Sequence, residues 1–152
     1  MNIEDRINSL GIKLPEASAP AGNYVPYVLA GNMVYISGQI SNGPDGLILG
    51  KLGANMDVEA GAAAAKTCAL HLIAQLKAAC GGDLNRVVQV VKLGGFVNST
   101  DDFTDQPKVI NGASDFMVEV FGDAGRHARA AVSAASLPLG VAVEIEGTFQ
   151  IK

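Results

Sequence analysis

The chain has 152 residues, 49% of them hydrophobic and 17% charged, which is typical of a globular protein. We therefore expect a single domain that covers residues 1–152. Two cysteines and two histidines are too few for a disulfide framework, and their spacing does not suggest a four-ligand zinc site. The net charge of −4 argues against nucleic acid as a partner, and no apolar run approaches the roughly 20 residues of a membrane span.

The N-terminal region predicts a short helix followed by a connection. Residues 3–10 have helical character and stop at Gly11, and residues 16–23 are small and turn-forming. Acidic residues stand where a signal peptide would carry positive charge, so we expect a cytoplasmic location.

A hairpin is predicted next. Residues 24–29 and 33–37 have β character and are separated by the turn sequence Gly31-Asn32. Residues 41–56 hold four glycines and predict a loop with one short strand at most.

The clearest helix covers residues 57–80. Asp57 suits its N-cap, Glu59 lies in the first turn, and Gly81-Gly82 end it. Apolar residues recur at steps of three and four, and the alanines that begin this stripe allow a neighbouring element to approach closely. The stripe consists of Val58, Ala62, Ala65, Ala69, Leu72, Leu76 and Ala79.

Three further residues of this helix invite a chemical interpretation. We expect His71 to be a surface or partly buried structural histidine. Cys68 and Cys80 would lie about 18 Å apart along the helix, too far for a disulfide, so both are interpreted as packing residues.

The second half of the chain predicts three strands and one helix. Residues 87–97 form a β-branched strand in which Gly94-Gly95 indicates a bulge or a close backbone approach. A helix begins at Pro107, and residues 129–135 and 141–151 are the last two strands. The buried face of that helix is predicted to contain Ile110, Ala113, Met117, Val120, Phe121 and Ala124.

This order of elements predicts a two-layer α/β domain with both long helices on one face of a sheet. The opposite face would then be bare, and an oligomer is the commonest way to cover such a face.

The last two strands carry the most informative polar groups. The strand period places Glu144 and Glu146 on one face and the neighbouring aliphatic residues on the other. Arg129 stands among alanines, with room for its guanidinium to bind a carboxylate through two parallel hydrogen bonds. The alternative is an ordinary Arg–Glu pair between neighbouring strands.

Two other segments remain open at this point. Arg126-His127 can form an anion site with Arg129 or belong to a solvated loop. Ser37-Gly38-Gln39 ends a strand, where the glycine either lets a backbone amide approach a ligand or simply makes a turn. No phosphate loop, nucleotide fingerprint, metal motif or serine-hydrolase elbow is present, so no cofactor and no metal are expected.

Three segments together carry a resemblance that spans nearly all the chain beyond its first twenty residues. The most specific one runs from Ala128-Arg129-Ala130-Ala131-Val132 through Leu137-Pro138 to Glu144 and Glu146. The others are Gly22-Asn23-Tyr24-Val25 with Gly31-Asn32-Met33 and Ser37-Gly38-Gln39-Ile40, and Val91-Lys92 through Phe96-Val97 to Asp102-Phe103 and Asn111. In these segments the chain resembles the Rid family, the reactive intermediate deaminases, which were earlier grouped as YjgF-type proteins and labelled L-PSP endoribonucleases.

The resemblance implies a chorismate-mutase-like (ferredoxin-like) fold that assembles as a homotrimer around a central β-barrel, with ligand pockets between subunits. It also implies hydrolysis of reactive enamines or imines, such as 2-aminoacrylate, to a 2-keto acid and ammonia. By motif, Arg129 would bind the substrate carboxylate, the Gly38 amide would orient the substrate, and Glu144 would hold or activate the attacking water. Tyr24, Ser37 and Asn111 would line the pocket.

The chain resembles a longer, less characterised branch of this family. Ala131 stands where the family has a cysteine, residues 1–20 form an N-terminal extension, and residues 104–108 appear inserted. Arg126-His127 replaces a more apolar, proline-containing sequence. Two alternative functions stay open: a non-catalytic binding module for small carboxylates or keto acids, which Ala131 favours, and RNA cleavage, which the older label suggests and the acidic charge disfavours.

Overall fold

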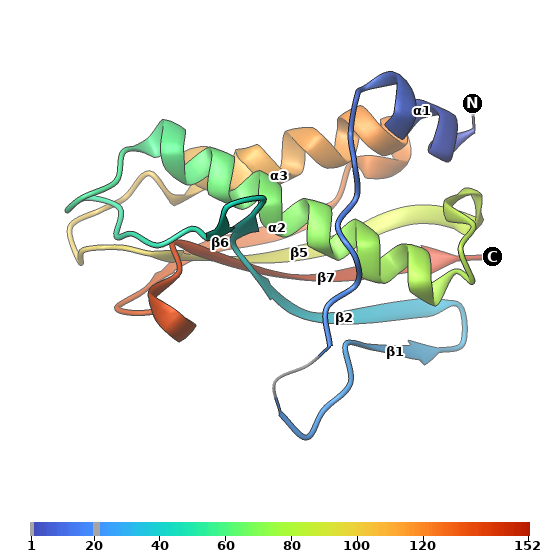
Figure 1. Cartoon of the computed structure of the whole chain (residues 1–152), viewed down its shortest axis with the longest axis horizontal. Helices are drawn as coiled ribbons and strands as arrows, with labels where there is room; N and C mark the ends of the chain where they lie inside the picture. Colours follow the sequence, from blue (N-terminus) through green and yellow to red (C-terminus); the bar gives the residue numbers. More distant parts are fainter. Residues whose placement is uncertain (1, 20–21) are drawn as a thin grey trace.

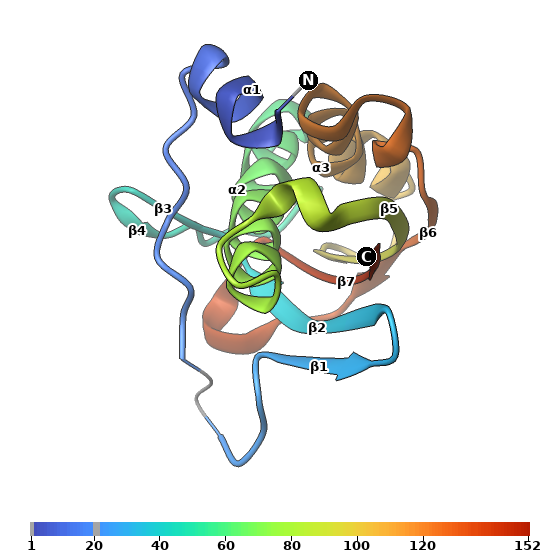
Figure 2. The ribbon, with the colours of Figure 1, turned by 90° about the vertical axis from the view of Figure 1, so that its right-hand side faces the viewer.

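Two long helices lie side by side on one face of a five-stranded sheet (Figures 1 and 2) in the computed structural model, which describes residues 2–19 and 22–152. The helices are α1 (Ile3–Ser9), α2 (Val58–Ala79) and α3 (Gln106–Phe121), with short 3-10 turns η1 (Leu84–Arg86), η2 (Gly122–Gly125) and η3 (Pro138–Gly140). The strands are β1 (Tyr27–Ala30), β2 (Met33–Ile40), β3 (Asn42–Gly43), β4 (Gly46–Leu47), β5 (Val87–Asn98), β6 (Ala128–Ala134) and β7 (Val143–Ile151). The predicted two-layer α/β architecture is therefore confirmed.

The sheet has the order β1-β2-β7-β5-β6. Only β5 and β6 pair in parallel, and the other neighbours are antiparallel. The last two strands of the chain are therefore not neighbours, because β5 lies between β6 and β7. Strands β1 and β6 form the two edges, and α3 covers the β6 end of the sheet.

Helix α2 begins and ends as the sequence predicts. The side chain of Asp57 accepts a hydrogen bond from the amide of Ala60 at 2.8 Å, which is the expected N-cap. The alanine-rich start of the helix lets α3 approach closely, since a Cβ added at Gly112 would overlap the backbone carbonyl of Ala62. The second half of α2 is buried on nearly all sides, and the segment of residues 11–19 runs across it (Figure 1).

Three local predictions need correction, and one open alternative is decided. Strand β1 begins at Tyr27 rather than at residue 24, because Pro26 has no amide to donate to a sheet. Strand β2 continues three residues further than predicted, and the 41–56 loop contains two short strands, β3 and β4, instead of one. Of the two interpretations of Gly94-Gly95, the close backbone approach is confirmed at Gly95, which lies against Ile110 of α3. A bulge is not formed there, because both glycines pair regularly and the register of β5 shifts only near its start.

The face of the sheet away from the helices is bare, as expected. In β7, Val143 and Ile145 are buried under the helices, whereas Glu144 is half-buried and Glu146 is exposed on the opposite face. Tyr35 and Val132 lie on that opposite face with 48% and 47% of their surface exposed. No helix in the described parts of the chain combines the length and hydropathy needed to cross a membrane.

Candidate functional site

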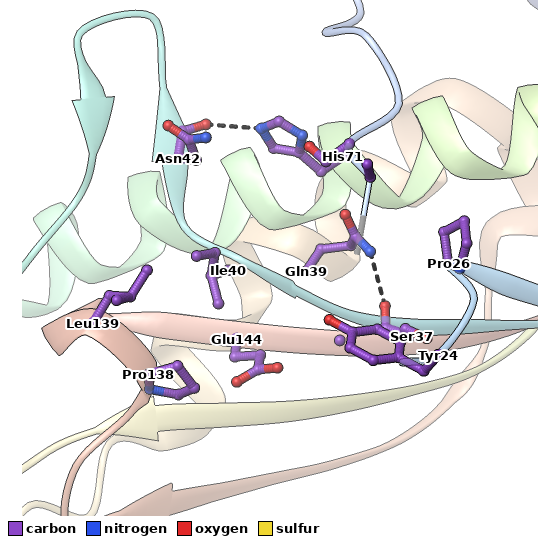
Figure 3. Close-up of a pocket in the computed structure, with 13 residues that line it drawn as sticks. Tyr24, Pro26, Ser37, Gln39, Ile40, Asn42, His71, Pro138, Leu139 and Glu144 are labelled. Atoms are coloured by element: carbon purple, nitrogen blue, oxygen red, sulfur yellow. Dashed lines mark hydrogen bonds between the residues drawn. The ribbon is translucent and has the colours of Figure 1, made fainter. Parts of the chain in front are cut away.

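A cavity of about 420 Å³ surrounds residues 37–40 of β2 (Figure 3). Strand β1 pairs only with residues 33–36 of β2, so the part of β2 beyond them has an edge that β1 does not cover. Four of the six predicted site residues line this cavity: Tyr24, Ser37, Gly38 and Glu144.

Ser37 and Gly38 form a β-bulge at the centre of the cavity. In the register of β2 with β7, these two residues face the single residue Glu146. A Cβ added at Gly38 would overlap a carboxylate oxygen of Glu144 and lie 3.0 Å from its Cδ. Glycine is therefore required for the backbone to lie directly against the Glu144 carboxylate.

Ser37 holds the segment that carries Tyr24. Its amide donates to the carbonyl of Pro26 at 2.9 Å, and its hydroxyl donates to the carbonyl of Val25 at 2.8 Å. Gln39 donates its side-chain Nε2 to the carbonyl of Ser37 at 3.0 Å. The Tyr24 ring remains 54% exposed at the rim of the cavity (Figure 3).

The Glu144 carboxylate has an increased affinity for protons. Partial burial raises the pKa of Glu144, and the nearby Glu146 carboxylate raises this pKa further. Neither ion pair among the described residues involves Glu144. The side chain is therefore a carboxylate without a cation in its own subunit, next to a backbone bulge in a cavity.

Arg129 lies on the other face of the sheet from Glu144. It pairs in register with Leu93 of β5, whereas Glu144 pairs with Phe96. Residues three positions apart on a strand point to opposite faces, and Leu93 belongs to the core under the helices. An Arg–Glu pair between neighbouring strands, the alternative interpretation of these residues, is therefore not formed.

A chain of hydrogen bonds fixes the Arg129 guanidinium against α3. Its Nη1 donates to the hydroxyl oxygen of Ser114 at 3.0 Å, and its Nη2 donates to the carbonyl of Pro107 at 3.3 Å. The Gly125 carbonyl can only accept, so Nδ1 of His127, 2.7 Å away, carries the ring proton. Nε2 of His127 then accepts from the Ser114 hydroxyl at 2.8 Å. Two of the five guanidinium N–H groups are used, which leaves the others available to a ligand.

Asn111 belongs with Arg129. It is exposed on α3 and lies four residues after Pro107 and three before Ser114, so all three share one face of the helix. We name Arg129, Asn111 and Ser114 the basic half-site, and Tyr24, Ser37, Gly38 and Glu144 the acidic half-site. Within one subunit Asn111 and Ser114 share the face of α3 that holds Arg129, the acidic half-site lines one cavity, and Arg129 and Glu144 lie on opposite faces of the sheet.

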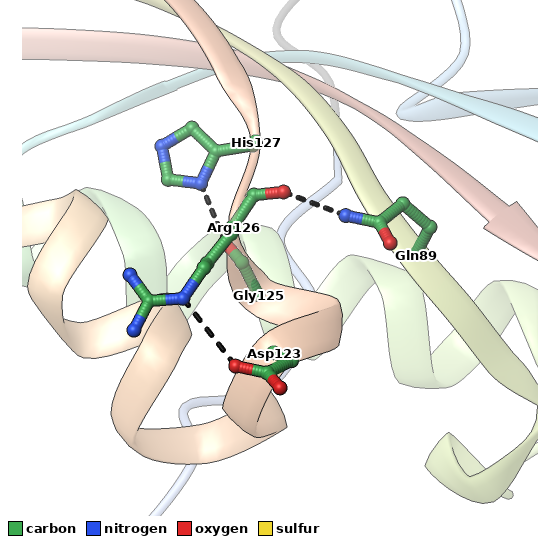
Figure 4. Close-up of polar contacts among 5 residues, drawn as sticks. All are labelled: Gln89, Asp123, Gly125, Arg126 and His127. Carbon is green, nitrogen blue, oxygen red and sulfur yellow. Dashed lines mark hydrogen bonds and ion pairs between the residues drawn. The ribbon is translucent and has the colours of Figure 1, made fainter.

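Arg126 and His127 have separate environments (Figure 4). The Arg126 side chain is 71% exposed and lies 3.4 Å from Asp123, and its carbonyl accepts from Gln89 at 2.6 Å. Arg126 therefore fits the solvated-loop interpretation and not the anion site. His127 supports the basic half-site through its hydrogen bond with Ser114.

Sequence reasoning missed Ser114 and undervalued His71. Ser114 could have been found by helical period, because it lies one turn after Asn111. His71 is 8% exposed and lines the cavity, which corrects the expectation of a surface or partly buried position. No local signal predicts this burial, because distant segments of the chain cause it. Cys68 and Cys80 are buried free cysteines, as predicted.

Comparison with known proteins identifies the family. The model described as "YjgF/chorismate mutase-like, putative endoribonuclease" matches residues 4–145. The chain is 51% identical over 147 residues to Protein TCP17 of Trypanosoma cruzi, covering 95% of this chain and 91% of that protein. The chain therefore belongs to the YjgF/chorismate mutase-like family, and its resemblance to the Rid proteins is confirmed.

Solved structures agree with this assignment. The protein Atu1372 of Agrobacterium tumefaciens, of unknown function, is 44% identical with a TM-score of 0.90, covering 99% of this chain and 94% of that chain. RidA of an Antarctic Psychrobacter species is 32% identical with a TM-score of 0.59, covering 90% of this chain and 94% of that chain. The chorismate-mutase-like α/β fold is thus confirmed, and the chain lies structurally nearer to the Agrobacterium protein than to RidA.

Proposed function

We propose that the protein hydrolyses reactive 2-imino and 2-enamino acids of the 2-aminoacrylate type to 2-keto acids and ammonia. The observation that carries this proposal is the Glu144 carboxylate, which lies against the Gly38 bulge inside a cavity. Its raised pKa suits a group that accepts a proton from water and returns it during one reaction. Family membership supports the same chemistry, because this chain keeps the arginine and glutamate of the Rid motif.

The reaction needs water and no redox partner. Glu144 takes a proton from a water molecule while the water oxygen forms a bond to the imine carbon, and the nitrogen takes up a proton as the C=N double bond becomes single. The hydroxyl proton of the resulting carbinolamine then passes to Glu144, the amine takes up a proton, and the C–N bond breaks to release ammonia and leave the 2-keto acid. An enamine first takes a proton at carbon to become the imine. Because such imines also hydrolyse unaided, positioning supplies most of the required acceleration.

We infer that a second copy of the chain completes the site, in a homotrimer around a central β-barrel. Arg129 is on the edge strand β6, and the described residues use two of its five N–H donors. No lysine or arginine is among the described residues that line the Glu144 cavity. Tyr35 and Val132 expose apolar surface on the bare sheet face, which a partner would cover. A neighbouring subunit's basic half-site would then face the acidic half-site, and its arginine would bind the substrate carboxylate.

The first test compares two arginine variants. Imines are generated in situ by an amino-acid oxidase, and release of keto acid and ammonia is followed. Arg129→Ala should lower kcat/KM by at least about 100-fold, because a charge-assisted bidentate contact to the substrate is lost. Arg126→Ala is the matched control and should retain the wild-type rate, since its side chain is solvated. Equal rates for wild type and Arg129→Ala would exclude the proposed function.

The second test asks whether the site lies between subunits. Arg129→Ala and Glu144→Gln chains are each expected to be inactive alone. When they are unfolded together and refolded at equal amounts, about a quarter of the sites should combine an intact arginine with an intact glutamate from different chains. Recovery of activity near that fraction supports a shared site, and no recovery in correctly assembled mixed trimers contradicts it.

One observation favours a second candidate, the binding of small carboxylates without catalysis. Ala131 shares the face of β6 with Arg129 and offers no reactive group where the family has a cysteine. Calorimetry with 2-ketobutyrate decides between the two: binding that requires Arg129, together with no hydrolysis of any imine, supports the binding module.

A further inference from the structure

One end of the cavity is lined by polar groups that the proposed reaction does not use. Gln39, Asn42 and His71 come from β2, β3 and α2 (Figure 3). Ser18 comes from the N-terminal segment. We name these four residues the polar end of the cavity. Glu144 and the bulge at Gly38 line the same cavity, so a ligand bound at the acidic half-site can extend toward the polar end.

His71 presents a hydrogen-bond acceptor at the polar end. Its Nε2 lies 3.0 Å from the carbonyl oxygen of Asn42, which can only accept, so Nε2 carries the ring proton. In this tautomer Nδ1 is the acceptor nitrogen. None of the described residues hydrogen-bonds to it.

The side-chain amides of Gln39 and Asn42 provide further hydrogen-bonding groups at the polar end. Gln39 uses its Nε2 on the Ser37 carbonyl, which leaves its Oε1 as an acceptor. The Asn42 side chain has no hydrogen-bond partner in the described parts of the chain, although its backbone amide and carbonyl are both bound. Polar groups near a cavity that lack partners bind water or a ligand group.

Residues 18 and 19 of the N-terminal segment line this end of the cavity. Gln75, which is 1% exposed, donates its Nε2 to the carbonyl of Ser18 at 2.8 Å and so fixes residues 11–19 across α2 (Figure 1). Ile12 and Leu14 pack against the core in the same segment. A hydrogen bond from Gln75 and the apolar packing of Ile12 and Leu14 therefore both hold this segment against the domain.

Charge and size restrict what the polar end can bind. Glu144 is the only carboxylate among the residues that line the cavity in the described chain, and no lysine or arginine accompanies it. An anionic side chain would be repelled, whereas a neutral donor would be accepted. Within one subunit the cavity of about 420 Å³ extends from Glu144 to Asn42 and His71, so a side chain longer than that of a three-carbon imino acid can reach the polar end.

We propose that the physiological substrates are 2-imino acids whose side chain ends in a neutral hydrogen-bond donor, a hydroxyl or a carboxamide, bound at His71 and the neighbouring amides. This inference rests on the proposed function, because it places the reacting carbon at Glu144. It adds a substrate class that the reaction itself does not specify.

The experiment compares two imino acids that differ by one group. Homoserine and norvaline have side chains of equal length that end in a hydroxyl and a methyl, and an L-amino-acid oxidase converts each to its 2-imino acid in situ. The wild-type protein should show about a fivefold to tenfold higher kcat/KM for the homoserine-derived imine, the effect of one net hydrogen bond. A ratio of one or below would overturn the inference.

Three variants assign the preference to the polar end. His71→Leu and Asn42→Ala should each bring the ratio toward one. Asn8→Ala, an exposed asparagine in α1, is the matched control and should keep the ratio. Asn42→Ala leaves the backbone contact to His71 intact, so it decides the question even when His71→Leu fails to fold. A ratio that Asn42→Ala and every folded His71 variant leave unchanged would contradict the inference.

Failure of the proposed function has a different signature. If neither imine is hydrolysed in a manner that requires Arg129, catalysis is excluded. The dissociation constants of the two corresponding 2-keto acids, measured by calorimetry, then test the inference directly. A preference of at least about fivefold for the hydroxylated keto acid supports recognition of a neutral donor at the polar end without catalysis, and equal or absent binding overturns that recognition too.

Discussion

Replacing Gly38 by alanine isolates the contact between the bulge and Glu144. The backbone at Gly38 does not adopt a positive φ, so alanine introduces no conformational strain there. The new methyl carbon would lie 3.0 Å from Cδ and 3.2 Å from Cγ of Glu144. Ordinary carbon contacts are about 3.5–4.0 Å, so the carboxylate must move by about 0.5–1 Å. A misplacement of about 1 Å costs up to about 100-fold in rate, or about 2.7 kcal/mol of transition-state free energy.

The stability of the same variant should change little. The half-buried, flexible Glu144 side chain can move aside. Alanine also lowers the conformational entropy of the unfolded chain relative to glycine, which offsets part of the free energy that this displacement costs. We therefore expect kcat/KM for imine hydrolysis to fall by about 10-fold to 100-fold while the free energy of unfolding changes by less than about 1 kcal/mol. Gly43→Ala is the control, since its Cβ would lie 3.6 Å from Ile48 in ordinary contact. Wild-type kcat/KM in Gly38→Ala would refute the role assigned to this contact.

Three further predictions concern the basic half-site, the acidic half-site and the helix contact. Ser114→Ala removes the acceptor that holds Arg129 and should weaken keto-acid binding about fivefold to tenfold in calorimetry, with the melting temperature unchanged; unchanged affinity would argue against positioning. Burial raises the pKa of Glu144, and its carboxylate is the active form. The decrease of kcat/KM at acid pH should therefore have its midpoint above the ordinary glutamate pKa of about 4.3, and a midpoint at or below that value would contradict this prediction. Gly112→Ala places a Cβ 2.7 Å from the carbonyl carbon of Ala62 and should cost about 1–3 kcal/mol in urea denaturation, so a stabilised variant would disprove the close helix contact.

The parts of the fold that local sequence determines were predictable. Asp57 caps α2 because its side chain is short and polar next to an apolar periodic segment, and Glu144 alternates with buried neighbours because β7 is one regular strand. Both properties depend only on residues a few positions apart. The same holds for Gly122, whose positive φ ends α3.

The parts that depend on pairing between distant strands were not predictable. The order of the last strands suggested that Arg129 and Glu144 are neighbours, but β5 lies between β6 and β7. Its register places Arg129 beside Leu93 and Glu144 beside Phe96, on opposite faces of the sheet. The bulge at Ser37-Gly38 exists only relative to β7. His71 is buried partly because β3 lies beside it, as its bond to Asn42 indicates, and no pattern in α2 reports that contact.

If a partner subunit completes the site, the separation of the two half-sites would make activity depend on subunit concentration. A lone subunit carries every residue named in the proposed reaction, yet its Arg129 and Glu144 face away from each other across the sheet. If partner subunits supply the missing half, dilution below the dissociation constant of the assembly would switch off hydrolysis without unfolding any chain. Turnover per chain would then rise steeply with concentration, and the cellular abundance of the protein would itself set how much of it is active.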